Sequence, residues 1–147
     1  MNKFFKIVFS IFLVLLIETS ISYSEETKIK IGVLVPLSGE NASLGKQLLN
    51  SIRMALIDLK NNEIEIYPKD TRSDPDVTLR SALELEKKGI SLVIGPVFHK
   101  NLLFLDKAKN ITFLSLTNKT LDLHKNIISS GVNSSSQLNT IKKFLET

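Results

Sequence analysis

The pattern of apolar and polar positions is clearest in residues 28–59, which read KIKIGVLVPLSGENASLGKQLLNSIRMALIDL. Residues 28–37 alternate at first and then become a continuous apolar run, which is typical of a strand covered on both faces in a parallel sheet. From about Ser43 onward, apolar residues recur every three or four positions and predict an amphipathic helix. The members of this apolar stripe are Leu44, Leu48, Ile52, Ala55, Leu56 and Leu59.

The loop of residues 36–43 joins this strand to this helix. Pro36 ends the strand because proline has no N–H for the ladder, and Gly39 relaxes the backbone. In open α/β sheets, ligands bind at the carboxyl ends of strands. Free N–H groups at the start of a helix favour an anionic or polar ligand there. Two interpretations stay open: either Ser38 and Gly39 contact a ligand, or the loop only connects two elements.

The rest of the chain repeats the alternation of strand and helix. Further strands are predicted over residues 63–67, 90–97, 111–117 and 126–132, and further helices over 75–88, 102–109 and 137–146. The helix over 75–88 has the clearest boundaries, because Asp74 suits an N-cap, Pro75 the first helical position and Gly89 a C-cap. Short loops imply right-handed parallel crossovers. We therefore predict an α/β fold with a doubly wound parallel sheet in strand order 2-1-3-4-5, its first two helices on opposite faces or flanking strand one.

The amino terminus reads as a targeting segment. Two lysines precede an almost wholly apolar run over residues 7–17, and small residues follow up to Ser24. This pattern predicts a secretory signal peptide, residues 1–24, with cleavage after Ser24. A membrane anchor is the alternative, but the apolar run is short for a span and Glu18 ends it. The mature chain, residues 25–147, is then predicted to be periplasmic and not membrane-spanning.

Composition excludes several classes of function. The 147 residues carry a formal net charge of +4, and the basic residues are scattered without interleaved aromatics, so no nucleic-acid partner is predicted. The chain has no cysteine, so it has no disulfide, no thiolate chemistry and no lipoprotein cysteine.

Residues with chemical potential are few. His99 and His124 are the chain's two histidines, and neither stands at a metal-ligand spacing, so no metal site is predicted. No nucleophile elbow, catalytic triad or nucleotide-binding loop occurs, so neither an enzyme nor a cofactor is predicted. Two alternatives stay open for individual side chains. Asp70 is either a base or the cap of a loop, and His99 is either a ligand donor or a solvated loop histidine.

Three segments in order resemble a known family. They are KIGVLVPLSGENASLGKQLLNSIRMAL, PKDTRSDPDVTLRSALELEKKGISLVIGP and ITFLSLTNK. Together they resemble the amino-terminal lobe of the type I periplasmic binding proteins, whose best-known members bind branched-chain amino acids for ABC transporters. Within that superfamily the sequence looks most similar to the penicillin-binding protein activator group, which carries similar LLPLSG, D-T and IGP-F segments. The resemblance covers residues 28–146, nearly the whole mature chain.

The resemblance implies a protein of two lobes that closes around a ligand at a hinge. Such proteins are usually more than twice as long as this chain. We therefore expect an incomplete amino-terminal lobe over residues 25–147, either as a fragment or with its other half on a second polypeptide. On its own it is expected to be marginally stable, to bind no small ligand tightly and to associate through an exposed sheet edge.

The resemblance also implies where a ligand would lie. In the amino-acid binders, the loop after the third strand supplies a small hydroxyl residue; here Phe98 and His99 occupy that place. The loop after the fourth strand supplies backbone groups and a threonine; here it contains Thr117 and Asn118. With Ser38 and Gly39 from the first loop, these residues form the predicted ligand-binding set.

Two functions follow from the resemblance. The first is a periplasmic solute-binding protein that delivers an amino acid or related small polar ligand to an ABC permease. The alternative is a non-enzymatic activator or scaffold of a peptidoglycan synthase. A binder is expected to gather polar groups in the cleft, whereas a scaffold is expected to expose apolar groups, as Phe98 hints.

Overall fold

Parallel strands form one sheet in the computed structural model, which describes residues 28–60, 62–119 and 123–146. Within these residues the strands are β1 (Ile29–Val35), β2 (Ile64–Asp70), β3 (Leu92–Ile94), β4 (Thr112–Ser115) and β5 (Ile127–Ser129). Their order is β2-β1-β3-β4-β5 and each neighbouring pair is parallel, which confirms the predicted topology. The predicted signal peptide lies outside the described residues, so its cleavage stays a prediction.

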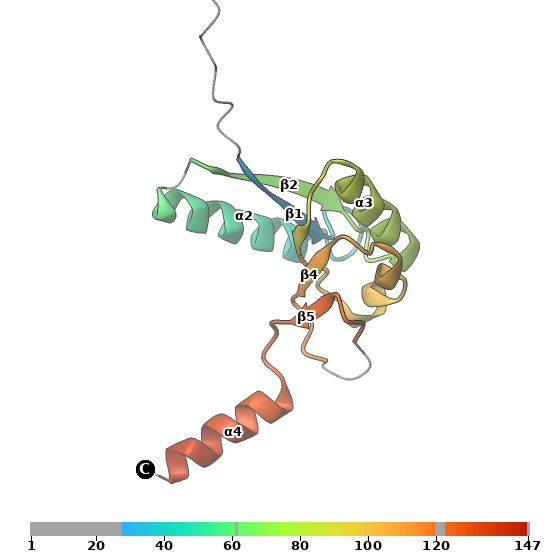
Figure 1. The fold of residues 1–147 in the computed structure, drawn as a ribbon. Coiled ribbons are helices and arrows are strands. Elements are labelled where there is room, and N and C mark those ends of the chain that lie inside the picture. The colour runs from blue at the N-terminus through green and yellow to red at the C-terminus, as the bar shows by residue number, and fades with distance from the viewer. Residues whose placement is uncertain (1–27, 61, 120–122, 147) are drawn as a thin grey trace, which may run out of the picture.

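Helices α2 (Ala42–Leu59) and α3 (Pro75–Lys87) cover opposite faces of the sheet at β1, as Figure 1 shows. Alternate side chains of β1 separate the two layers, because successive residues of a strand point to opposite faces. Val33 and Val35 pack in one buried cluster with Leu49 of α2. Leu34 packs on the other side, in a cluster that includes Leu85 of α3.

The core on the α3 side continues beneath β3, β4 and β5. Val93, Phe113 and Ile127 each come from one of these strands and are buried in the same cluster. The chain between β3 and β4 covers them with a short apolar series: Leu102, Leu105, Ala108 and Ile111.

This covering segment is a correction to the sequence prediction of a helix over residues 102–109. The structure instead has two 3-10 helices, η2 (His99–Leu102) and η3 (Leu105–Lys107). The spacing of the buried residues explains the difference. Leu102, Leu105 and Ala108 recur every three positions, which matches the three residues per turn of a 3-10 helix and not the 3.6 of an α-helix.

The predicted apolar stripe of α2 is confirmed in part, because Leu48 and Ile52 pack against the buried cluster of Val33 and Val35. Leu49 is buried, whereas Leu44 and Leu59 are exposed. Gly45 is also buried and packs directly on the preceding loop, where an added Cβ would lie 1.8 Å from the carbonyl oxygen of Pro36. The residues of α2 that face the sheet are thus Gly45, Leu48, Leu49 and Ile52.

The end of β2 and the start of α4 both differ from the sequence prediction. Strand β2 continues through Pro68 to Asp70, because β2 is an edge strand and proline is tolerated where one side of the ladder is open. Helix α4 (Ser134–Leu145) begins earlier than the predicted residue 137. Asn133 caps it by accepting a hydrogen bond from the N–H of Ser136, and the Ser136 side chain completes a capping box with the backbone of Asn133.

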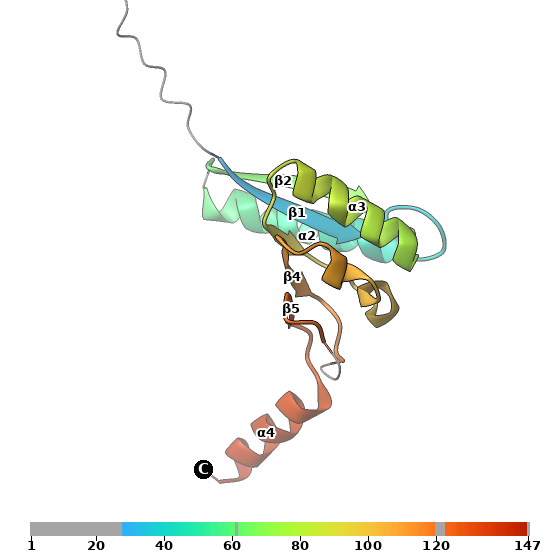
Figure 2. The same ribbon diagram turned by 45° about the vertical axis from the view of Figure 1, so that its right-hand side comes forward.

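Helix α4 departs from the rest of the molecule. None of its residues is buried, and both ribbon views show it running away from the sheet after β5 (Figures 1 and 2). Among the described residues, no helix has the length and apolar character needed to cross a membrane.

Candidate functional site

The carboxyl edge of the sheet contains the point where the chain reverses its direction of winding. From β1 the chain goes to β2 on one side and later to β3 on the other, so the switch lies between β1 and β3. Residues 36–41 follow β1 and residues 95–98 follow β3, and these loops border the switch. The two strands approach closely there: a Cβ on Gly95, whose φ is +102°, would lie 2.2 Å from the carbonyl oxygen of Leu34. In open α/β folds this position is the usual place for a ligand.

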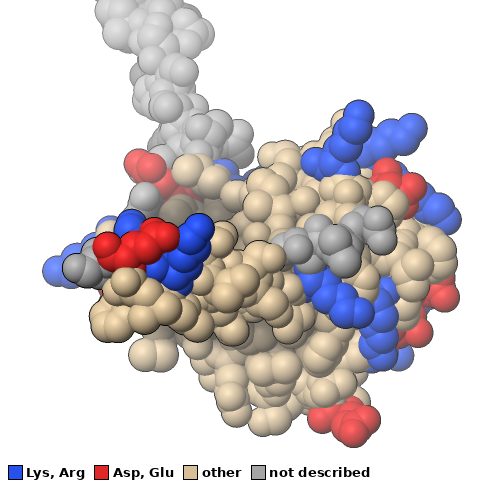
Figure 3. Space-filling model, turned by 90° about the horizontal axis from the view of Figure 1, so that it is seen from below, with Lys and Arg blue, Asp and Glu red and all other residues tan. Residues whose placement is uncertain are grey.

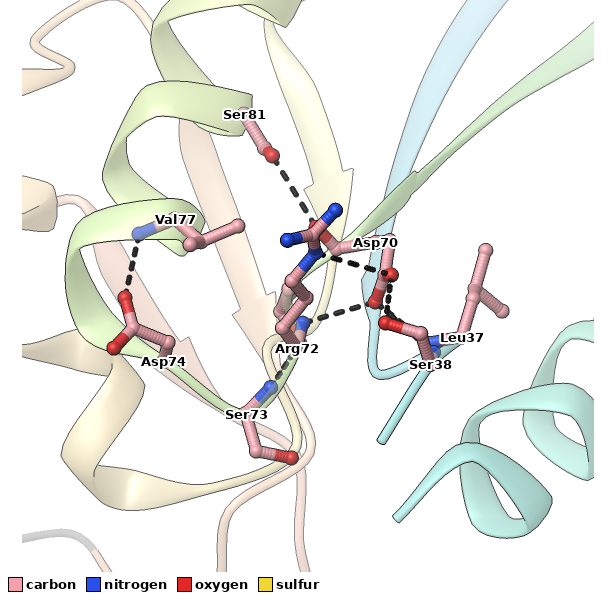
Figure 4. A network of polar contacts seen from close by, with 9 residues as sticks. Leu37, Ser38, Asp70, Arg72, Ser73, Asp74, Val77 and Ser81 are labelled. Carbon is pink, nitrogen blue, oxygen red and sulfur yellow. Dashed lines mark hydrogen bonds and ion pairs between the residues drawn. The ribbon is translucent and has the colours of Figure 1, made fainter. Parts of the chain in front are cut away.

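The side chain of Asp70, at the end of β2, points towards Leu37 and Ser38 of the loop after β1 (Figure 4). Its Oδ1 accepts hydrogen bonds from the backbone N–H groups of Leu37 at 2.8 Å and Ser38 at 3.3 Å, and its Oδ2 accepts the Ser38 hydroxyl at 2.5 Å. Oδ1 also accepts the N–H of Arg72 at 2.9 Å. The carboxylate therefore takes up two backbone N–H groups and the hydroxyl of the loop after β1, whereas the N–H groups at the start of α2 lie further along, from Ala42 onward.

These contacts bear on the two interpretations of Asp70. Partial burial raises the pKa of its carboxyl, but the hydrogen bonds from Ser38, Arg72 and Leu37 together lower it by more, so the net pKa is below its ordinary value. A general base works best with a pKa near the working pH. The geometry thus favours the interpretation that Asp70 caps the loops after β1 and β2.

A second contact joins the same two loops. Arg72 and Ser73 are both left-handed, with φ values of +50° and +56°, and this sharp turn brings Ser73 towards the first loop. The Asn41 side chain donates a hydrogen bond from Nδ2 to Ser73 Oγ at 3.1 Å. Sequence reasoning missed this pair, because neither residue belongs to a pattern that links positions 32 residues apart. The two contacts hold the loops after β1 and β2 together.

The loop after β3 carries Phe98 and His99, both half-buried. The Nδ1 atom of His99 is buried and has no hydrogen-bond partner among the described residues. His99 also lines a mainly apolar cavity of about 410 Å³ together with Lys100, Leu102, Leu103, Leu123, His124 and Ile127. This cavity lies beside η2 and the start of β5. His99 therefore also faces the flank of the sheet, away from the switch point.

The loop after β4 holds Thr117 and Asn118. Thr117 is 3% exposed; its Oγ1 accepts the N–H of Lys119 at 3.3 Å and its carbonyl oxygen accepts the Ser129 hydroxyl at 2.9 Å. Asn118 is exposed. Thr117 thus connects this loop to the end of β5 through a hydrogen bond. Of the two side chains, only that of Asn118 is accessible to a ligand.

The predicted set of six residues divides by accessibility. Ser38, Gly39 and Asn118 are exposed, Phe98 and His99 are half-buried, and Thr117 is buried. All six follow the carboxyl ends of β1, β3 or β4, so they share one edge of the sheet. Their roles in binding stay predictions. In the part of the chain that the structure describes, no three His, Asp or Glu side chains come together in a metal-binding cluster.

Known proteins resemble this chain in sequence and in fold. The chain is 31% identical over 87 residues to an uncharacterized protein of Methanocaldococcus jannaschii. The aligned region covers 54% of this chain and 21% of that protein. The fold is similar to the C-domain of LpoA (YraM) from Haemophilus influenzae, a regulator of PBP1A. That comparison has a TM-score of 0.62 and 22% identity over 78% of this chain and 37% of that one. At this identity the likeness shows the fold alone.

A third relative is the solute-binding protein of an ABC transporter from Rhodopseudomonas palustris BisB5, solved in complex with 3,4-dihydroxybenzoic acid. Its TM-score is 0.55, with 27% identity over 63% of this chain and 28% of that one. This chain therefore spans between about a fifth and two fifths of the length of these relatives. The family model of the periplasmic binding proteins matches residues 28–146. The parallel sheet, its switch point and this match together show that the chain belongs to the periplasmic binding protein family.

Proposed function

We propose that this chain supplies one wall of the ligand site of a periplasmic solute-binding protein. The observation that carries the proposal is the position of Ser38, Gly39 and Phe98 on the two loops that border the switch between β1 and β3. A parallel sheet offers its loops to ligands at this edge.

The chemistry of these loops supports a ligand with a polar head and a small apolar body. Gly39 has a φ of +77° and open space around it, so its backbone is accessible. Asn118 adds an exposed amide, which can both donate and accept hydrogen bonds. Phe98 adds a half-buried aromatic ring. An amino acid or a small aromatic carboxylate has this combination, and one relative is described in complex with 3,4-dihydroxybenzoic acid. In this proposal, the bound ligand is then delivered to an ABC permease.

A titration followed by NMR tests this function. One wall alone is expected to bind weakly, with a dissociation constant of about 1 mM or higher, because small-molecule sites usually enclose most of the ligand. Leucine, glutamate and 4-hydroxybenzoate would be added to the isotope-labelled chain. We expect backbone amide shifts for at least one of them at residues 38–39, 98 and 118.

Phe98→Ala should abolish these shifts, and Phe104→Ala is its matched control because Phe104 lies on the connection between η2 and η3. Shifts that cluster around the cavity of His99 and His124 would place ligand binding elsewhere. No shift with any of the three compounds at about ten times that concentration would remove the support for a solute-binding role.

A second candidate is a non-enzymatic activator or scaffold of a peptidoglycan synthase. The observation that favours it is that the Ser38 hydroxyl is bonded to Asp70 and Thr117 is buried, which leaves fewer free polar groups for a small ligand. Large apolar side chains are exposed elsewhere, as a protein-binding surface requires. Co-sedimentation with a purified bifunctional penicillin-binding protein, with its glycan polymerisation rate measured, tests this candidate. An unchanged rate together with no association would count against it.

Both candidates require export. We propose that the chain is periplasmic and begins at Glu25 after cleavage behind Ser24, on the strength of the apolar run and the small residues before the cleavage position. Mass spectrometry of the periplasmic fraction is expected to find Glu25 as the first residue. A membrane-bound product that still carries Met1 would contradict this assignment.

A further inference from the structure

The apolar cavity of about 410 Å³ lies on the α3 side of the sheet, between η2 and the segment that leads into β5. Leu102 and Ile127, which are 4% and 6% exposed, form its floor, and Leu103, which is 56% exposed, lies at its rim. Small-molecule sites have a similar volume and are lined mainly by apolar side chains. None of residues 36–41 is among the described residues that line it, so it is separate from the loop after β1.

Hydrogen bonds of Asn126 hold the two sides of this cavity together. Its Nδ2 donates to the carbonyl oxygen of Leu105 at 3.0 Å and to that of Ala108 at 3.2 Å, which joins the segment before β5 to the segment between β3 and β4. The N–H of Ile127 donates to the carbonyl oxygen of His124 at 2.9 Å, so these two lining residues belong to one tight turn. The cavity is therefore formed by the fold itself, as ligand sites usually are.

His99 supplies a polar group to the cavity. Its Nδ1 atom is buried and has no hydrogen-bond partner among the described residues. A buried N–H group without an acceptor is unfavourable, so the proton of the neutral imidazole belongs on Nε2. His99 lines the cavity, and because Nδ1 is buried, Nε2 is the nitrogen that the ring presents to a ligand. The side chain can thus donate one hydrogen bond to an acceptor in the cavity.

The other polar residues of the lining favour an anion. Lys100 and His124 are both exposed, so they lie at the mouth of the cavity. No acidic side chain is among the lining residues that the structure describes. The carboxylate of Asp106 lies 3.9 Å from Nε2 of His124, but it lines a neighbouring depression, where Lys109 and Lys125 offset its charge.

The surface charge at this end of the molecule has the same sign. Strand β5 lies at the lower end of the sheet in Figure 1, and Figure 3 shows the molecule from below. In that view, lysine and arginine side chains cover more of the surface than acidic side chains do (Figure 3). A positive surface raises the local concentration of anions and speeds their association.

We propose that this cavity binds a monocarboxylate with an extended apolar body, of the kind represented by a medium-chain fatty acid. The carboxylate accepts the hydrogen bond of His99 Nε2 and lies beside the charge of Lys100, while the apolar chain covers the floor of the cavity. The volume suits a ligand of roughly ten non-hydrogen atoms, which is the size of octanoate. An amino acid fits less well, because its ammonium group meets no acidic side chain in this lining. The site is thus distinct from the one proposed at the switch between β1 and β3.

Three probes test the head and the tail of the ligand separately. Octanoate, octylammonium and butanoate would be titrated into the isotope-labelled chain and followed by backbone amide shifts. We expect octanoate to shift residues 99–103 and 123–127 with a dissociation constant of about 1 mM or lower. Octylammonium should bind at least about tenfold more weakly, because it cannot accept the hydrogen bond of His99 and is repelled by Lys100. Butanoate should also bind at least about tenfold more weakly, because it buries fewer methylene groups.

Octanoate shifts centred on residues 38–39 and 118 would overturn the proposal, because they would assign this ligand to the switch point. Equal dissociation constants for octanoate and octylammonium would also overturn it, since the lining would then not select an anion. Absence of any octanoate shift at about ten times the expected dissociation constant would show that the cavity is not a site for this class of ligand.

Two variants test the contacts with the carboxylate. His99→Phe keeps an aromatic ring without the Nε2 donor, and should weaken octanoate binding about tenfold while leaving that of octylammonium within a factor of about two. Lys100→Gln should weaken octanoate binding about threefold at low salt, because Lys100 is an exposed charge. Lys109→Gln removes the same charge from the neighbouring depression and is the matched control, with a change of less than about 1.5-fold.

Far-UV circular dichroism establishes that each variant is folded. Lys100 and Lys109 are both exposed, so their comparison stays valid even where His99→Phe perturbs the fold. Unchanged octanoate binding in folded H99F, or equal effects of K100Q and K109Q, would overturn the proposal.

Discussion

At the scale of single residues, Asp70 is the side chain that organises the candidate site at the carboxyl edge of the sheet. It accepts hydrogen bonds from the loop after β1 and from the turn after β2, so it couples two loops that the chain separates by about 30 residues. The sequence raised two roles for it, and its contacts favour the structural one. The loop that presents Ser38 and Gly39 depends on this carboxylate.

Asp70→Asn is expected to lower the free energy of unfolding at neutral pH by about 1–2 kcal/mol, because hydrogen bonds to a charged acceptor are replaced by weaker neutral ones. Urea unfolding at pH 7 measures this change. Asp58→Asn, at an exposed position of α2, is the control and should change it by less than about 0.5 kcal/mol.

The same side chain sets a pH dependence. Because the folded-state pKa of Asp70 is lowered, its contribution is fully present above the pKa of an unfolded aspartate, about 3.9. The contribution is lost as the pH falls below that value through the folded-state pKa. Between pH 5 and pH 3, D70N should therefore lose less stability than the unaltered chain. An equal loss of unfolding free energy in the two proteins between pH 5 and pH 3 would contradict this account.

At the scale of elements, caps and close packing set the boundaries of the helices. The side chain of Asp74 accepts the N–H of Val77 at 2.8 Å, and Pro75 begins α3. Both features were predicted from sequence, since they depend on residues within one turn. Helix α2 is positioned differently, by the contact of Gly45 with the carbonyl of Pro36.

Asp74→Ala should cost about 1 kcal/mol of stability, because the N–H of Val77 then loses its cap. Thermal unfolding followed by circular dichroism at 222 nm gives the comparison. Asp76→Ala, in the first turn of the same helix, removes only a favourable charge at the helix start and should cost a few tenths of a kcal/mol. Equal losses for the two variants would mean that the cap is not what stabilises α3.

Gly45→Ala is expected to destabilise the chain by at least about 2 kcal/mol, although alanine is the better helix former, because the new Cβ would overlap a backbone carbonyl. Ser51→Ala, at an exposed position of α2, should be neutral or slightly stabilising. Urea midpoints of the two variants test the contact, and a stabilised G45A would show that α2 can move away from the loop at little cost.

At the scale of the whole molecule, the sheet is covered on both faces at β1 and on one face at β3 to β5. The α3 side has a continuous buried cluster, whereas the α2 side is open beyond Ile94. This asymmetry supports the expectation of marginal stability for the chain alone. It also gives association a defined surface, in addition to the edges at β2 and β5.

We expect a free energy of unfolding of about 5 kcal/mol or less for the single copy, at the low end for a domain. If copies of the chain associate through an exposed sheet edge, the urea midpoint should rise with protein concentration, because association stabilises the folded state by mass action. Unfolding at about 2 μM and 200 μM tests both points. A concentration-independent midpoint with a free energy near 10 kcal/mol would show that the open face is tolerated without a partner.

The sequence by itself predicted the strand order, the parallel sheet and the cap of α3, and it left open whether α2 and α3 lie on opposite faces or flank the first strand. These features follow from apolar period, loop length and residues within one turn, all of which are local. Only the tertiary structure decided that α2 and α3 lie on opposite faces, that Asp70 takes the donors of the first loop, that Asn41 meets Ser73, and that Gly45 packs on the carbonyl of Pro36. It also decided that two 3-10 helices, His99–Leu102 and Leu105–Lys107, stand where an α-helix over 102–109 was predicted, and that α4 stands apart. Each of these depends on which distant surfaces come into contact, and that information is not contained in the local pattern of the chain.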